Sequence, residues 1–210
     1  MAVTILLTGF GPFPGAPFNP TAALVKRLAR RRRPALADVK IVPHIFATRY
    51  AAVDRELPRL IARHKPDALL MFGLATRAKT LRIETRARNA LTLLADASGS
   101  TPRRHAIAAS VAPVIQMPAP TRRLHAAIRS TGVPAALSRD AGRYLCNYLC
   151  WRATEAAAKA GGPRLAAFVH VPPLRAGGRP RRGSKRSLSL DDLVRSGGRL
   201  LVALAAAVRH

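Results

Sequence analysis

Four short runs rich in apolar residues recur along the chain, and most of the segments between them repeat their apolar residues every three or four positions. The runs predict strands at Val3–Thr8, Val39–Phe46, Asp67–Gly73 and Arg164–Val171, and the first and third of these are expected to be buried. The helical spacing marks Thr21–Arg33, Arg49–His64, Thr121–Ser130 and a last helix opened by Ser189 as N-cap. Strands that alternate with helices indicate an α/β fold, in which a mostly parallel sheet is covered on both faces.

The first predicted strand leads into a loop rich in glycine, proline and phenylalanine. Binding groups of α/β proteins gather in such loops at strand ends. This loop lacks the glycine spacing of a phosphate loop and carries Phe10, Phe13 and Phe18, with Asn19 as a polar group. Two interpretations stay open, which are a hydrophobic plug under the loop and a pocket for a flat apolar ligand.

A stretch of strict alternation at Thr80–Ala87 predicts another strand. One face carries Leu81, Ile83, Thr85 and Ala87, and the other carries Arg82, Glu84, Arg86 and Arg88. Glu84 is the lone carboxylate among these arginines. Its spacing favours a surface ion pair, and the alternative is a functional carboxylate.

The segment Arg139–Trp151 holds the best candidate nucleophile, Cys146. A turn leads into residues with helical spacing, so Cys146 is expected in about the first turn. Unpaired N–H groups and the helix dipole there favour a thiolate and stabilise an oxyanion beside it. The competing interpretation is a small buried hydrophobic residue. Cys150 lies four residues along the same helix, a poor geometry for a disulfide.

His170 is predicted at the carboxyl end of a late strand, where it is either a core histidine or a catalytic one. Cys146, His170 and Glu84 have the residue types of a nucleophile, a base and a group that orients the base. Sequence spacing does not establish that the three meet in space.

Composition narrows the class of protein. The 210 residues fit one domain, 49% are hydrophobic, and the formal net charge is +26. Such a charge favours contact with nucleic acid, but the few aromatic residues are not interleaved with the basic runs, so we expect no specific nucleic-acid binding. Two thiols without a disulfide framework suggest a reducing compartment. Neither the N-terminal segment nor Leu200–Val208 has the features of a signal peptide or a membrane span, and the basic segment at about 175–186 predicts a surface loop.

Four segments together resemble the pyroglutamyl-peptidase I (pyrrolidone-carboxylate peptidase) family of cysteine peptidases over nearly the whole chain. They are Leu7–Phe13 with Asn19-Pro20, Gly73–Asn89, Asp140–Asn147 and Phe168–Pro172. The resemblance implies a single-domain three-layer α/β/α sandwich over residues 1–210, without a metal or cofactor, in a cytoplasmic homotetramer. It implies no membrane partner.

The resemblance also implies an activity, which is hydrolysis of the bond after an N-terminal pyroglutamyl residue of peptides through a thioacyl enzyme. By motif the catalytic residues are Cys146, His170 and Glu84, and the substrate-binding residues are Phe10, Phe13 and Asn19. The chain departs from the family pattern at Thr92–Asp96 and after Pro173, which concerns the pocket rim and subunit contacts. The alternatives are a basic binding protein without catalysis and a thiol hydrolase of another small amide.

Overall fold

The computed structural model describes residues 2–13, 15–109, 111–174 and 188–209. In chain order its elements are β1 (Val3–Phe10), α1 (Pro20–Arg30), η1 (Pro34–Leu36), β2 (Val39–Phe46), α2 (Tyr50–His64), β3 (Ala68–Leu74), β4 (Leu81–Glu84), β5 (Arg86–Arg88), β6 (Val114–Gln116), α3 (Thr121–Arg129), β7 (Ala135–Ser138), α4 (Leu145–Ala157), β8 (Leu165–Val171) and α5 (Leu190–Arg209). The predicted strand bounds of β2 are confirmed residue for residue.

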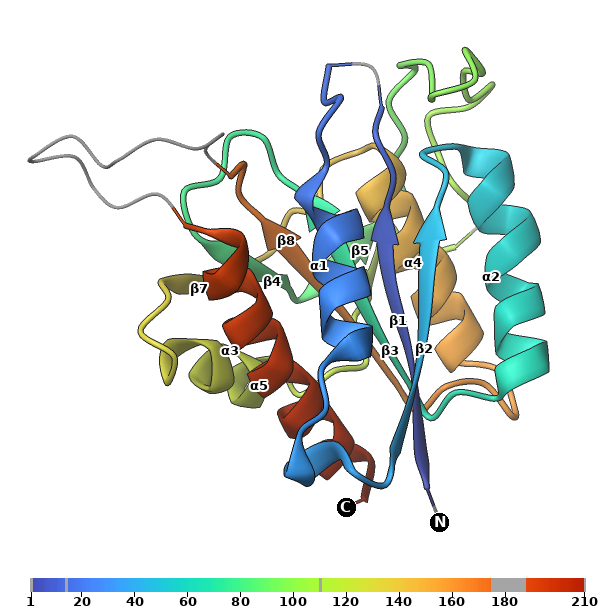
Figure 1. Ribbon diagram of the computed structural model, residues 1–210. Helices are drawn as coiled ribbons and strands as arrows, with labels where there is room; N and C mark the ends of the chain where they lie inside the picture. The colour runs from blue at the N-terminus through green and yellow to red at the C-terminus, as the bar shows by residue number, and fades with distance from the viewer. Residues whose placement is uncertain (1, 14, 110, 175–187, 210) are drawn as a thin grey trace, which may run out of the picture.

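The central sheet has the strand order β2-β1-β3-β8-β4-β7. Neighbouring strands pair in parallel except β8 and β4, which are antiparallel; β4 and β7 are parallel to each other. Helices α1, α3 and α5 cover one face, and α2 and α4 cover the other (Figure 1). The predicted α/β fold with a mostly parallel sheet and helices on both faces is therefore confirmed.

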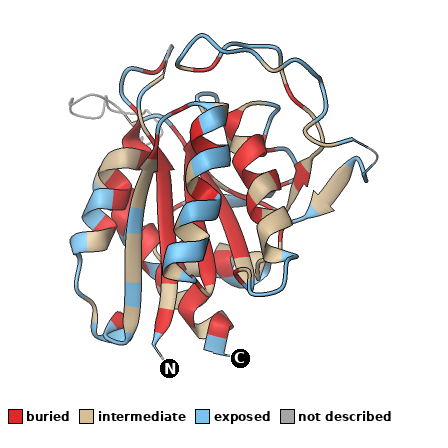
Figure 2. Ribbon diagram, turned by 90° about the vertical axis from the view of Figure 1, so that its right-hand side faces the viewer, coloured by how far each residue is buried: buried red, intermediate tan, exposed pale blue. Residues whose placement is uncertain are grey.

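Alternation along the strands separates two hydrophobic clusters. In β8, Ala167, Val169 and Val171 face α1 and α5, whereas Ala166 and Phe168 face α2 and α4. The inner strands β1, β3, β8 and β4 are buried almost throughout, whereas the edge strands β2 and β7 and the outward faces of the helices are partly or fully exposed (Figure 2). Because His170 is two residues from Phe168, its side chain belongs to the α4 face of the sheet.

The predicted continuous strand over Thr80–Ala87 is wrong, because the chain leaves the sheet at Thr85. The amide and hydroxyl of Thr85 both donate to the carbonyl of Ser138, at 2.8 and 2.9 Å. Beyond this point β5 pairs with β6 in a separate two-stranded sheet. The predicted helix Thr21–Arg33 is also too long, since α1 ends at Arg30.

Two further expectations concern the C-terminal part. Ser189 begins α5 as expected, because its hydroxyl accepts a hydrogen bond from the amide of Asp192 at 3.1 Å. The basic loop expected at about 175–186 lies outside the described residues. In the described part of the chain, every helix is too short or too polar to span a membrane.

Candidate active site

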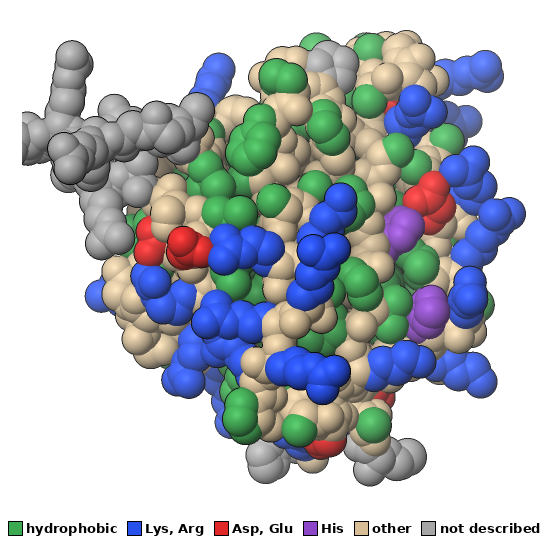
Figure 3. All heavy atoms as spheres, in the orientation of Figure 1, with side chains coloured by type: hydrophobic (Ala, Val, Ile, Leu, Met, Phe, Trp, Pro, Cys, Tyr) green, Lys and Arg blue, Asp and Glu red, His purple; other side chains and the backbone are tan. Residues whose placement is uncertain are grey.

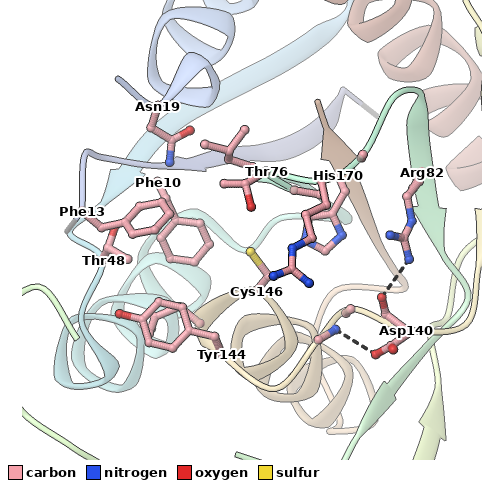
Figure 4. A pocket seen from close by; sticks show the side chains of 17 residues that line it. Phe10, Phe13, Asn19, Thr48, Thr76, Arg82, Asp140, Tyr144, Cys146 and His170 are labelled. Atoms are coloured by element: carbon pink, nitrogen blue, oxygen red, sulfur yellow. Dashed lines mark hydrogen bonds between the residues drawn. The ribbon is translucent and has the colours of Figure 1, made fainter. Parts of the chain in front are cut away.

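A pocket of about 510 Å³ opens at the carboxyl end of the central strands, beside the start of α4 (Figure 4). Its walls come from segments that are far apart in the sequence: the end of β1 and its loop, the residue Thr48 after β2, the β3–β4 connection with Arg82 of β4, the turn before α4 with the start of that helix, and β8. The lining includes Cys146, His170, Phe10, Phe13 and Asn19. The fold thus gathers five of the six predicted site residues around one cavity.

Cys146 is the second residue of α4, so the prediction that it lies in the first helical turn is confirmed. Tyr144 precedes the helix without a side-chain cap, and the first turn contains no acidic residue. The backbone N–H groups of this first turn are therefore available to a ligand, and no acidic side chain there offsets the positive end of the helix dipole. The sulfur lies against β3, where a Cβ added to Gly73 would come within 2.6 Å of Cys146 Sγ.

Glu84 is the sixth predicted site residue and lies directly behind His170. The antiparallel register pairs Arg82 with His170 and Glu84 with Phe168, so Glu84 and His170 are diagonal neighbours on the α4 face. His170 Nδ1 donates to Glu84 Oε1 at 2.8 Å. Glu84 is fully buried, so the interpretation as a surface ion pair is wrong. The arginines beside it indicated a strand face open to solvent, but α4 covers this face.

The charge state of His170 follows from its neighbours. Burial by itself lowers the pKa of His170, but the negative charge and hydrogen bond of Cys146, together with Glu84, outweigh burial and raise the pKa to about 9. The imidazole is therefore protonated at neutral pH, between a sulfur on one side and a carboxylate on the other. Such a pair can hold a thiolate ready for attack and then release a proton.

Aromatic side chains form one wall of the pocket. Phe10 is 2% exposed and ends β1, and Phe13 packs against Tyr144 with ring centroids 6.4 Å apart. The hydroxyl of Tyr144 donates to the carbonyl of Ala95 at 2.9 Å, which fixes this ring. Phe18 is 62% exposed and does not line the pocket, so two of the three predicted phenylalanines form this wall.

Asn19 lines the pocket, but its side chain also begins α1. Its Oδ1 accepts hydrogen bonds from the amide and hydroxyl of Thr21, and its Nδ2 donates to the carbonyl of Gly11 at 3.1 Å. Among the described residues these bonds leave one amide hydrogen for a ligand. The sequence signal for this second role was an asparagine followed by proline, which is typical of a helix start.

Arg82 is a pocket residue that sequence reasoning did not select. Its Nη2 donates to the hydroxyl of Ser138 at 2.6 Å and to the carbonyl of Asp140 at 3.1 Å. Its Nε lies 3.9 Å from Glu84 Oε1. Arg82 therefore connects the carboxylate behind His170 to the turn that leads into α4. The alternating sequence pattern predicted which face of the strand Arg82 occupies, but not which residues it contacts.

Thr48 and Tyr144 were also missed. Thr48 follows β2 and its hydroxyl donates to the carbonyl of Gly11 at 3.1 Å. Its position after a strand end was an available signal. Tyr144 was assigned only to the helical pattern. Within the described residues, no cluster of three or more His, Cys, Asp or Glu side chains is arranged to hold a metal ion.

Comparisons with known proteins agree with this architecture. The family model of peptidase C15, pyroglutamyl peptidase, matches residues 3–210. A pyrrolidone-carboxylate peptidase of Streptococcus suis is 31% identical over 209 residues, which cover 98% of this chain and 93% of that protein. A second one, from Thermococcus onnurineus, is 31% identical over 169 residues, which cover 80% of this chain and 82% of that protein. The crystal structure of Bacillus amyloliquefaciens pyroglutamyl peptidase I matches with a TM-score of 0.83 and 28% identity over 97% of each chain.

Proposed function

This chain belongs to the pyroglutamyl peptidase family, and we propose that it hydrolyses the peptide bond after an N-terminal pyroglutamyl residue, with Cys146 as nucleophile. The observation that carries the assignment of roles is that Cys146 and His170 line one pocket, with Glu84 directly behind His170. His170 and Glu84 are joined by a 2.8 Å hydrogen bond, and Cys146 begins an uncapped helix.

The first half of the reaction acylates the enzyme. The Cys146 thiolate attacks the carbonyl carbon of the pyroglutamyl residue, and the carbonyl oxygen becomes an oxyanion. The free amides at the start of α4 stabilise this oxyanion. Protonated His170 then gives its proton to the leaving nitrogen, so the C–N bond breaks, the shortened peptide leaves with a new amino terminus, and a thioester remains on Cys146.

The second half restores the enzyme. His170, now neutral, takes a proton from water while the water oxygen attacks the thioester carbon. The C–S bond breaks, pyroglutamate leaves, and the thiolate and imidazolium are regenerated. Glu84 keeps the Nδ1 proton of His170 in place, so that Nε2 exchanges protons with the sulfur and the leaving nitrogen.

The aromatic wall supports pyroglutamate as the substrate. The lactam ring is flat and uncharged, and it offers one N–H and one C=O. We assign its packing to Phe10 and Phe13 and a hydrogen bond to the remaining amide hydrogen of Asn19. A substrate that begins with glutamine or glutamate instead carries an ammonium group, and these three side chains hold no carboxylate to pair with it. Burying that charge unpaired costs several kcal/mol.

The test is kcat/KM on four matched amides that begin with pyroglutamate, glutamine, glutamate or proline. We expect rapid cleavage of the first and discrimination of roughly 10⁴-fold against the others, because groups placed for the lactam are left unpaired. Phe13→Ala should weaken pyroglutamyl cleavage without slowing alkylation of Cys146. Comparable values for pyroglutamate and proline would favour a thiol hydrolase of another amide.

The remaining expectations extend this proposal to the cell. From the family resemblance we propose a cytoplasmic homotetramer that acts on peptides.

Lys and Arg side chains are spread over much of the face shown in Figure 3 and are interrupted by hydrophobic patches. Such a surface produces a general positive field, so nucleic acid should bind weakly, without sequence preference and with steep salt dependence. A sequence-selective complex at physiological salt would contradict this expectation.

A further inference from the structure

Two arginines line the pocket in addition to the aromatic wall. Arg77 comes from the β3–β4 connection, and Arg82 comes from β4. In Figure 4, Phe10, Phe13 and Asn19 lie to one side of Cys146, and Arg82 lies on the other side, beyond His170. If the pyroglutamyl ring lies on the aromatic wall, as the proposed function requires, the residue that follows it extends toward the arginines.

The charge of this side is not balanced by acids. Among the lining residues, all of which the structure describes, Asp140 is the one carboxylate. Its Oδ1 accepts from the amide of Gly142 at 3.0 Å and lies 3.5 Å from Arg88 Nη1. Asp140 is therefore already engaged by a third arginine outside the pocket.

Neither pocket arginine has a close carboxylate partner. Arg82 donates to two neutral oxygens, and its nearest carboxylate is Glu84 at 3.9 Å, which His170 already holds. Arg77 is exposed and forms no ion pair with any described residue. A partly enclosed site with uncompensated guanidinium groups favours a carboxylate, which matches the planar donors of arginine.

We propose that Arg77 and Arg82 form a carboxylate subsite for the residue that follows pyroglutamate. The enzyme then prefers peptides in which aspartate or glutamate occupies that position, and it disfavours lysine or arginine there. The inference rests on the proposed function, because the position of the leaving residue follows from that of the lactam ring. It adds a preference for the second residue of the substrate.

The test compares three peptide amides, in which pyroglutamate is followed by glutamate, glutamine or lysine. Glutamine has the shape of glutamate without its charge, and the C-terminal amide removes the competing terminal carboxylate. A fourth peptide, pyroglutamyl-glutamine with a free C-terminus, measures whether that carboxylate uses the same subsite. Cleavage exposes a new primary amine in each peptide, which gives the rate.

We expect kcat/KM for the glutamate peptide to exceed that for the glutamine peptide about fivefold at low salt, with the lysine peptide lowest. The preference should shrink toward unity in about 0.5 M salt, because partly exposed charges are screened. Arg77→Glu should bring the glutamate-to-glutamine ratio to one or below, since the new carboxylate also offsets Arg82. Arg30→Gln is the control, because it removes an exposed positive charge at the far end of α1 and should leave the ratio unchanged.

The outcomes separate the two proposals. Cleavage of the glutamine peptide with no preference for glutamate would overturn the subsite and leave the peptidase function intact. A preference that survives in Arg77→Glu, or that is lost equally in Arg30→Gln, would also overturn the subsite. Failure to cleave any of the four pyroglutamyl peptides would overturn the proposed function, and the subsite with it.

Discussion

Helices α4 and α5 begin in opposite ways. At α5, the hydroxyl of Ser189 accepts from the amide of Asp192, and the amide of Ser189 donates to the carboxylate of Asp192 at 2.9 Å. Acidic residues occupy the first turn, as the helix dipole favours. At α4, Tyr144 provides no side-chain cap, the first turn contains no acid, and the turn carries Cys146.

The difference indicates what each helix start does. A reciprocal cap of the α5 type satisfies two orphan donors within the chain and stabilises the fold. The donors of α4 face a pocket instead, where an oxyanion is the natural acceptor. The comparison predicts that changes at the start of α4 alter turnover, whereas changes at the start of α5 alter the free energy of unfolding.

The strongest test is at the two thiols of α4. Cys146→Ala should lower kcat by roughly 10⁴-fold or more, because the nucleophile is lost, while alanine preserves the helix. Cys150→Ala, one turn deeper, should keep most of the activity. Release of a fluorescent amine from a pyroglutamyl amide measures both variants. An inactive but folded Cys150→Ala would show that the nucleophile is misassigned.

A smaller loss is expected at Glu84, which acts on Cys146 only through His170. Glu84→Gln keeps the shape of the side chain but removes its charge, so we expect kcat to fall about 100-fold, which corresponds to ~2.7 kcal/mol. Loss of His170 should cost more, because His170 itself carries the proton. The measurement is kcat for Glu84→Gln beside His170→Ala. An unchanged rate in Glu84→Gln would remove Glu84 from the site.

The pKa of His170 tests the contacts between His170, Cys146 and Glu84 without a substrate. Burial lowers the pKa of His170, and Cys146 is the largest of the causes that raise it to about 9. In Cys146→Ala we expect the pKa to fall by at least about one unit, or ~1.4 kcal/mol, measured by NMR titration of the imidazole. A midpoint that stays near the wild-type value would mean that Glu84 alone holds the proton.

The raised pKa of His170 also sets the direction of the pH dependence of stability. The folded state binds this proton more tightly than the unfolded state, in which the pKa of a histidine is about 6.5. The stabilisation is therefore complete below about pH 6.5 and is lost as the pH rises through about 9. Unfolding in denaturant across this range should show a smaller decline in Cys146→Ala than in the wild type.

Much of the sheet could be predicted from the sequence, because its inner strands are short apolar runs, and strands that alternate with helices pair mostly in parallel. The break at Thr85 could not, since it depends on hydrogen bonds to Ser138, 53 residues away. The burial of Glu84 could not be predicted either, because it also depends on a distant part of the chain. Alternation tells which residues share a face, but not whether a helix from elsewhere in the chain covers that face.

The site shows the same division between local and distant information. Cys146 could be placed in the first turn of a helix from spacing alone, and its motif came from the family resemblance. The dual role of Asn19 and the contacts of Arg82 depend on side chains brought together by the fold. Their hydrogen-bond partners at Gly11, Ser138 and Asp140 carry no pattern that a single sequence displays.

The smallest expected effect completes the comparison from the α5 side. Ser189→Ala leaves the amide of Asp192 without its acceptor, so the free energy of unfolding should fall by about 1 kcal/mol. The values of kcat and KM on a pyroglutamyl amide should not change, because the cap of α5 makes no contact with the thiol or the imidazole. Ser130→Ala is the matched control: its exposed hydroxyl donates to the carbonyl of Ala127 at the end of α3, and its loss should change stability less. Denaturant unfolding beside initial rates separates the two effects. A Ser189→Ala protein with native stability and reduced turnover would mean that the start of α5, like that of α4, takes part in the site.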